Sequence, residues 1–75
     1  MILDFKPVVR NKHTNDLYFY NGENSFTNIR TKTSGTVSDE VARKTFNINY
    51  EATSIINDYP IVAEMINKLQ LIIEN

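Results

Sequence analysis

Residues 17–33 read LYFYNGENSFTNIRTKT and carry the strongest local structural signal in the chain. The first four residues are aliphatic or aromatic, a composition that favours a β-strand. Asn21-Gly22 follows directly, and this dipeptide favours the positive φ angles of a type I′ hairpin turn. A threonine-rich return strand then runs from Ser25 to Thr33. These residues together predict a β-hairpin.

A further strand is predicted before the hairpin, over residues 2–9, where apolar and charged side chains alternate. Pro7 cannot donate a ladder hydrogen bond, so we expect this strand to lie at a sheet edge or to end there. Residues 11–16 are polar throughout and predict the loop that joins it to the hairpin.

The spacing of apolar residues becomes helical after Gly35. Ser38 and Asn49 can each cap a helix, because a side-chain oxygen at that position accepts from a backbone N–H of the first turn. Pro60 suits the first turn of a third helix. The residues expected to be most deeply buried are Phe46, Ile56, Ile66 and Leu69.

Strands followed by helices predict an α+β fold. We expect a small antiparallel sheet of about three strands in residues 1–34, with two or three helices in residues 35–75 packed on one face. The 75 residues suffice for a single domain with one core. No apolar run approaches the roughly 18 residues that cross a bilayer. The start lacks the features of a secretory signal, so we expect a cytoplasmic protein that binds no membrane.

The composition argues against catalysis and cofactor binding. There is no cysteine, which excludes disulfides, thiolate metal sites and cysteine nucleophiles. His13, the one histidine, lies in a polar loop with no indicated carboxylate partner, so a catalytic triad is not predicted. Asp39 and Glu40 are better explained as first-turn carboxylates of a helix than as metal ligands. We therefore expect a non-enzymatic protein without a metal or cofactor.

The alternating pattern gives the hairpin two faces, and the sequence leaves open which one is buried. If the phenylalanines are buried, the open face shows Tyr18 and Tyr20 among hydroxyl residues. If the tyrosines are buried, the open face shows Phe19 and Phe26 beside basic residues. The second arrangement would form a platform on which bases of single-stranded nucleic acid stack.

The charges are distributed unevenly along the chain. The net charge is −1, but residues 1–34 hold five basic and three acidic groups, whereas residues 35–75 hold three and six. This asymmetry predicts a bipolar surface whose basic part comes from the N-terminal half.

Residues 41–57 resemble a helix-turn-helix, with Asn47 where a turn glycine often stands. The resemblance implies a second helix that reads DNA. Arg43, however, occupies a position where that motif places a small buried residue, and residues 50–57 contain one acidic and no basic group. Nucleic-acid binding, through this segment or through the basic aromatic hairpin, is the alternative function.

Binding to a protein is favoured by the hairpin aromatics and by a broad apolar face on the third helix. We expect a regulator or inhibitor that occludes a protein or ribonucleoprotein partner, as phage and other mobile-element accessories do when they block host defences. The sequence also leaves open whether the protein forms a homodimer. Tyr18 and Tyr20 are the expected anchors, and Arg30 and Lys32 the orienting charges. A regular hairpin places the two pairs on opposite faces, so one interface needs a bulge or the strand edge.

Overall fold

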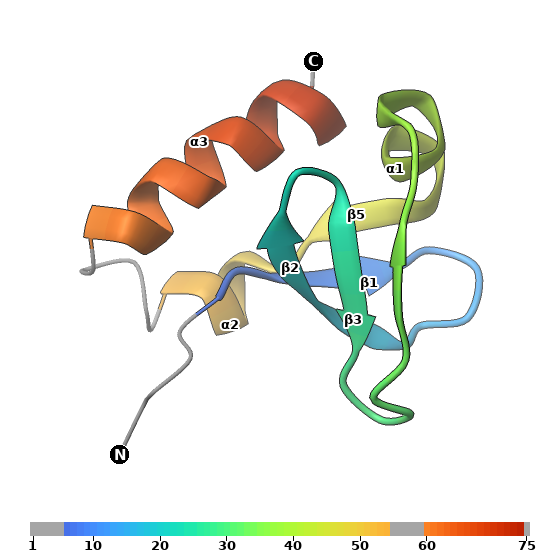
Figure 1. Cartoon of the computed structure of the whole chain (residues 1–75). Coiled ribbons are helices and arrows are strands. Elements are labelled where there is room, and N and C mark those ends of the chain that lie inside the picture. Colours follow the sequence, from blue (N-terminus) through green and yellow to red (C-terminus); the bar gives the residue numbers. More distant parts are fainter. Residues whose placement is uncertain (1–5, 55–59, 75) are drawn as a thin grey trace.

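The computed structural model describes residues 6–54 and 60–74. Its elements, in chain order, are β1 (Val8–Asn11), β2 (Leu17–Gly22), β3 (Ser25–Asn28), β4 (Ser34–Thr36), α1 (Asp39–Thr45), β5 (Phe46–Ile48), α2 (Tyr50–Ser54) and α3 (Pro60–Ile73). The fold is α+β, with helices packed against an antiparallel sheet (Figure 1). The sheet has five strands rather than about three, and one of them separates two helices.

The strand order in the sheet is β4-β3-β2-β1-β5. The first four strands follow one another as an antiparallel meander, and α1 returns the chain so that β5 pairs with β1. The strand predicted over residues 2–9 corresponds to β1, which begins after Pro7 and continues to Asn11. It lies between β2 and β5, so the prediction that it ends at Pro7 or lies at a sheet edge is wrong. Residues 2–5 lie outside the described part of the chain.

The strand β5 contradicts the predicted helix-turn-helix, because it lies where the turn between the two helices was expected. Asn47, which was assigned to the turn, lies in an extended strand opposite Arg10 of β1. The backbone N–H of Phe46 donates to the carbonyl of Ala42 at the end of α1. The chain therefore leaves α1 directly into a strand, and no helix-helix turn forms there.

The hairpin turn lies two residues later than predicted. Gly22 pairs with Ser25, so Glu23 and Asn24 are the central residues of the turn, and both have positive φ, 53° and 62°. Such angles are those of a type I′ turn. Gly22 also has a positive φ, 92°, and the register shifts between Tyr20 and Gly22.

The core lies between one sheet face and the helices α1 and α3, which Figure 1 shows on the same side of the sheet. Its buried members are Val9, Tyr20, Phe26, Ala42, Phe46, Ile48, Leu69 and Ile73. Burial is confirmed for Phe46, Ile66 and Leu69. Ile56, the fourth predicted core residue, lies outside the described residues.

The helices begin where the capping residues predict. The Ser38 hydroxyl accepts from the N–H of Val41, and Asn49 accepts from Ala52. α3 begins at Pro60. Among the described residues, no helix has the length and apolar character needed to cross a bilayer.

Candidate partner-binding surface

The strand pairing identifies the side chains on the sheet face that lies opposite the core. Residues directly opposite one another in neighbouring strands share a face. One such row crosses the sheet through Phe19, Thr27 and Ser34. A second row contains Arg10 and Leu17. We call this surface the outer face; its members are Arg10, Leu17, Phe19, Asn21, Ser25, Thr27, Ile29, Ser34, Thr36 and Asn47. Val8 pairs with Phe19 in the same row but is buried.

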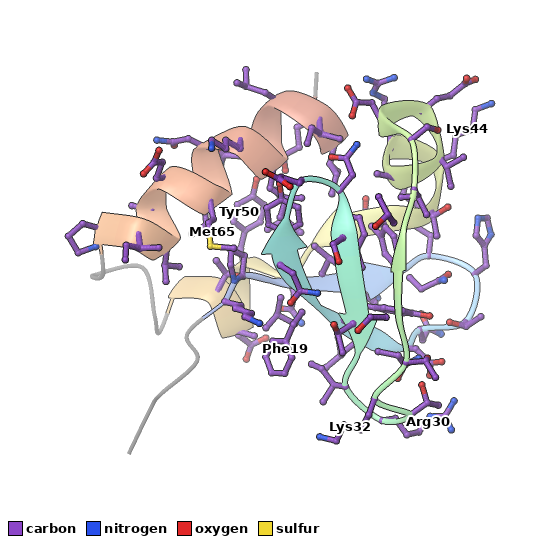
Figure 2. All side chains as sticks on the ribbon, viewed as in Figure 1. Phe19, Arg30, Lys32, Lys44, Tyr50 and Met65 are labelled. Atoms are coloured by element: carbon purple, nitrogen blue, oxygen red, sulfur yellow. The ribbon has the colours of Figure 1, made fainter. Side chains whose placement is uncertain are left out.

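An apolar centre occupies part of the outer face. Leu17 is 39% exposed, and Phe19 is partly exposed. Ile29, also partly exposed, extends the row beside Leu17, because its backbone N–H donates to the Leu17 carbonyl. Figure 2 shows Phe19 on the side of the sheet that faces away from α3. The outer face therefore offers apolar area to a partner, whereas the opposite face packs against the helices.

A line of polar side chains crosses the outer face beside this apolar centre. The Asn21 amide donates to the Thr27 hydroxyl at 2.7 Å, and the Thr27 and Ser34 hydroxyls lie 2.7 Å apart. At the other end, Lys6 Nζ donates to Asn21 Oδ1 at 3.0 Å. These bonds fix the side-chain rotamers before any partner binds, which lowers the entropy lost on association.

Cationic side chains border the outer face and the loop that follows β3. Arg10 is exposed within the sheet, and Arg30 and Lys32 are exposed in the loop. Figure 2 shows Arg30 and Lys32 at the end of the molecule away from α3. Arg30 Nη2 lies 3.3 Å from Asp16 Oδ2, and its side chain is 72% exposed. Exposed pairs of this kind contribute little energy, so Arg30 can exchange this contact for one with a partner.

Asn28 organises the loop that carries these two cations, and the sequence analysis did not identify it. It is buried, and its side-chain oxygen accepts from the N–H groups of Arg30 and Thr31 at 2.8 and 3.1 Å. Its amide donates to Asp16. Asn28 lies inside the return strand that was predicted from Ser25 to Thr33, and the strand ends at Asn28 instead. Asparagine is a known former of such turns, and this was the available signal.

The two tyrosines do not lie on the outer face. Tyr20 is 1% exposed and packs against Phe26, with ring centroids 5.4 Å apart. Tyr18 is partly buried and contacts Phe46 edge-on at 5.1 Å. The expectation that Tyr20 is an exposed anchor is therefore wrong.

The register shift at Asn21 decides which residues of β3 share a face with the tyrosines. The extra residue places Tyr20 opposite Phe26, so one tyrosine and one phenylalanine point into the core together. Neither predicted arrangement of the hairpin is realised, because the outer face shows Phe19 without Phe26. Arg30 and Lys32 lie in the loop after β3 rather than on the tyrosine-bearing face.

Within the described residues, no group of three or more histidine, cysteine, aspartate or glutamate side chains is placed to hold a metal ion. Comparison with known proteins finds no family model that matches the chain. No curated protein and no solved structure matches it significantly either. A functional proposal for this chain therefore depends on its own surfaces.

Proposed function

We propose that the protein is a non-enzymatic binding module that acts as a regulator or inhibitor by occluding the surface of a protein partner. The observation that supports this most directly is the outer face, where Leu17, Phe19 and Ile29 form an apolar centre beside exposed cations. Apolar residues gathered on one face and bordered by polar groups are typical of protein interaction sites.

The exposed cations indicate which kind of partner surface would complement this one. Arg10, Arg30 and Lys32 are all exposed cations. A partner with an apolar patch bordered by carboxylates would complement both parts of this surface. The charges would accelerate encounter and fix orientation, and the buried apolar contacts would slow dissociation. Occlusion follows from binding alone and needs no catalytic group.

Single-stranded nucleic acid is the alternative ligand, because Phe19 is a partly exposed aromatic side chain on a sheet that also carries Arg10. Stacking platforms use two or more aromatic side chains, one for each base. Phe26, the second aromatic residue expected on that platform, is buried in the core. A protein partner is therefore the better supported of the two.

The test compares three purified proteins as bait in extracts of the native host: the wild type, the outer-face variant Arg10→Glu with Leu17→Ser, and the control Lys44→Glu. Lys44 is exposed on α1, away from the outer face, as Figure 2 shows. We expect one protein to be retained by the wild type and the control and lost from the outer-face variant. The purified partner should then lose its own activity when the wild type is added.

Two results would contradict the proposal. One is equal capture of every protein by the outer-face variant and the wild type, with both variants folded by circular dichroism. The other is preferential binding of a single-stranded oligonucleotide, with an affinity that falls steeply as salt is raised and that the double substitution abolishes.

A further inference from the structure

β4 presents an open sheet edge beside the outer face, on which the side chains of Ser34 and Thr36 lie. It is the terminal strand in the order β4-β3-β2-β1-β5, and all three of its residues, Ser34-Gly35-Thr36, are exposed. Edge strands in natural proteins are commonly protected by a lysine, a proline or a bulge. β4 contains neither lysine nor proline, and its pairing with β3 is regular.

The register shows which backbone groups of β4 are unpaired. Backbone bonds join Asn28 N–H to the Thr33 carbonyl and Val37 N–H to the Asn24 carbonyl. Hydrogen-bonded pairs alternate with non-bonded pairs in an antiparallel ladder. The hydrogen-bonded pair that lies between Asn28–Thr33 and Asn24–Val37 is therefore Phe26–Gly35.

It follows that the N–H and C=O groups of Ser34 and Thr36 point away from β3. In the part of the chain that the structure describes, β4 pairs with β3 alone. The open edge therefore offers a row of two donors and two acceptors at the spacing of a β-strand. Backbone groups of this kind bind strongly to another extended backbone.

A cleft of about 340 Å³ lies beside this edge. The aromatic rings of Tyr18, Phe26 and Phe46 line it, and Val41 of α1, 45% exposed, also contributes. Among the described residues, no charged side chain lines the cleft; the remaining lining residues are Asn11, Thr33, Ser34, Gly35, Val37 and Thr45. The cleft therefore suits an uncharged, apolar side chain.

Gly35 leaves this cleft open. It pairs with Phe26, so a side chain at position 35 would lie on the core face of the sheet, over the Phe26 ring. The backbone of Gly35 does not have a positive φ, and a Cβ atom there would meet nothing within 4 Å. Neither backbone conformation nor packing requires glycine here, although glycine weakens a strand. Glycine in a strand often marks a close approach by a ligand or another backbone.

We propose that β4 binds an extended segment of a partner protein as an additional strand, and that one apolar side chain of this segment enters the cleft between Gly35 and Val41. The backbone groups of Ser34 and Thr36 would provide affinity, and the cleft would select the side chain. A second copy of the chain pairing through its own β4 is a poorer occupant, because Ser34-Gly35-Thr36 has no apolar side chain to fill the cleft. The site uses neither Arg10 nor Phe19 and so goes beyond the outer-face proposal.

The experiment selects binders from a displayed library of random short peptides on the wild-type chain and compares their binding to two variants. Gly35→Leu places a side chain in the cleft, because Gly35 lines it and a Cβ atom there meets nothing within 4 Å. Asn67→Leu is the matched control, because it adds a leucine at an exposed position of α3 that does not line the cleft. We expect selected peptides to bind the control like the wild type and to bind Gly35→Leu at least roughly tenfold more weakly.

Backbone recognition is tested on a selected peptide by N-methylation at alternate residues, which removes donors and leaves the side chains. We expect this to abolish binding, and we expect the unmodified peptide to slow hydrogen exchange at the Ser34 and Thr36 amides. The double variant Arg10→Glu with Leu17→Ser should still bind the peptide, which separates this site from the outer face.

The proposal would be overturned if no peptide distinguished the wild type from Gly35→Leu, or if N-methylated peptides bound as well as unmodified ones. It would also be overturned if sedimentation showed a dimer of the wild type that Gly35→Leu or Thr36→Pro disrupts. A folded amide NMR spectrum for each variant is required before these comparisons are made.

Discussion

Phe26 of β3 and Phe46 of β5 stack with their ring centroids 4.4 Å apart, although β2 and β1 lie between their strands. In a flat sheet, strands three steps apart are separated by about 14 Å. The sheet must therefore curl around these two rings, and it does so toward α1 and α3. This curvature explains why residues from both edge strands, β4 and β5, line one cleft.

The helix α3 should stabilise the protein only through the side chains that it buries against the sheet. Leu69 is fully buried in the core, whereas Leu71, two residues later in the same helix, is 70% exposed. We expect Leu69→Ala to lower the free energy of unfolding by about 2–5 kcal/mol, from lost burial and the cavity that remains. Leu71→Ala should change it by less than about 0.5 kcal/mol. Urea denaturation of both variants measures the difference, and equal losses would show that α3 packs by another face.

Local sequence signals predicted much of this fold. The aromatic strand, the capping residues Ser38 and Asn49, and Pro60 at the start of α3 all stand where their chemistry indicates. Each of these signals acts within a few residues of its own position. Helix caps and strand propensity are of this kind, and they could be read without knowledge of the tertiary structure.

The features that sequence reasoning missed depend on distant partners. β5 has only three residues, Phe46–Ile48, and is extended because β1 supplies its hydrogen bonds. The placement of Phe26 on the same face as Tyr20 depends on one extra residue, Asn21, which no local preference distinguishes from a turn residue. Because side chains alternate along a strand, a shift of one residue exchanges the faces. The candidate site therefore moved from the tyrosines to Phe19 and its neighbours.

Gly22 should be required for its backbone conformation rather than for space. Its φ is 92°, and a Cβ atom would meet nothing within 4 Å. Gly22→Val should destabilise the protein by about 1–2 kcal/mol, because a β-branched residue resists positive φ. The same substitution at Gly35, where φ is not positive, serves as the control. There the free energy of unfolding should stay constant or rise, because valine favours strands.

The comparison is made by thermal and urea unfolding of the two valine variants. Equal melting temperatures for Gly22→Val and the wild type would show that the left-handed conformation at position 22 is not needed. A large loss for Gly35→Val would show instead that the space beside β4 is filled in the folded protein.

Asn28 should hold the loop that presents Arg30 and Lys32. Asn28→Ala removes the acceptor of two backbone N–H groups and the donor to Asp16. We expect a loss of about 1–3 kcal/mol, since three part-buried hydrogen bonds are lost together. Hydrogen exchange at the backbone amides of Arg30 and Thr31 should become faster under conditions in which the protein as a whole stays folded. Asn47→Ala, at an exposed position in β5, is the matched control and should leave both measurements unchanged.

The final prediction concerns stability at high pH, where Tyr20 should make the folded state sensitive to alkali. Burial raises the pKa of the Tyr20 phenol above its ordinary value of 10.0, and this outweighs the hydrogen bonds that its oxygen accepts from the backbone N–H groups of Asn24 and Glu23. Below pH 10.0, both the folded and the unfolded states keep this proton, so Tyr20 adds no pH dependence there.

As the pH rises above 10.0, the unfolded chain loses the Tyr20 proton first and the folded chain retains it. The unfolded state then binds fewer protons, so the free energy of unfolding falls until the pH passes the folded pKa. Tyr20→Phe should therefore reduce the alkaline loss of stability, although it should be less stable than the wild type at neutral pH by about 0.5–1.5 kcal/mol from the lost hydrogen bonds. Tyr50→Phe should also reduce the alkaline loss, because the hydrogen bond from Tyr50 to Glu74 raises the pKa of Tyr50 at an exposed position. Urea unfolding at a series of pH values above 10.0 measures these slopes. A Tyr20→Phe variant whose stability falls with pH as steeply as that of the wild type would show that the Tyr20 phenol ionises equally well in the folded protein.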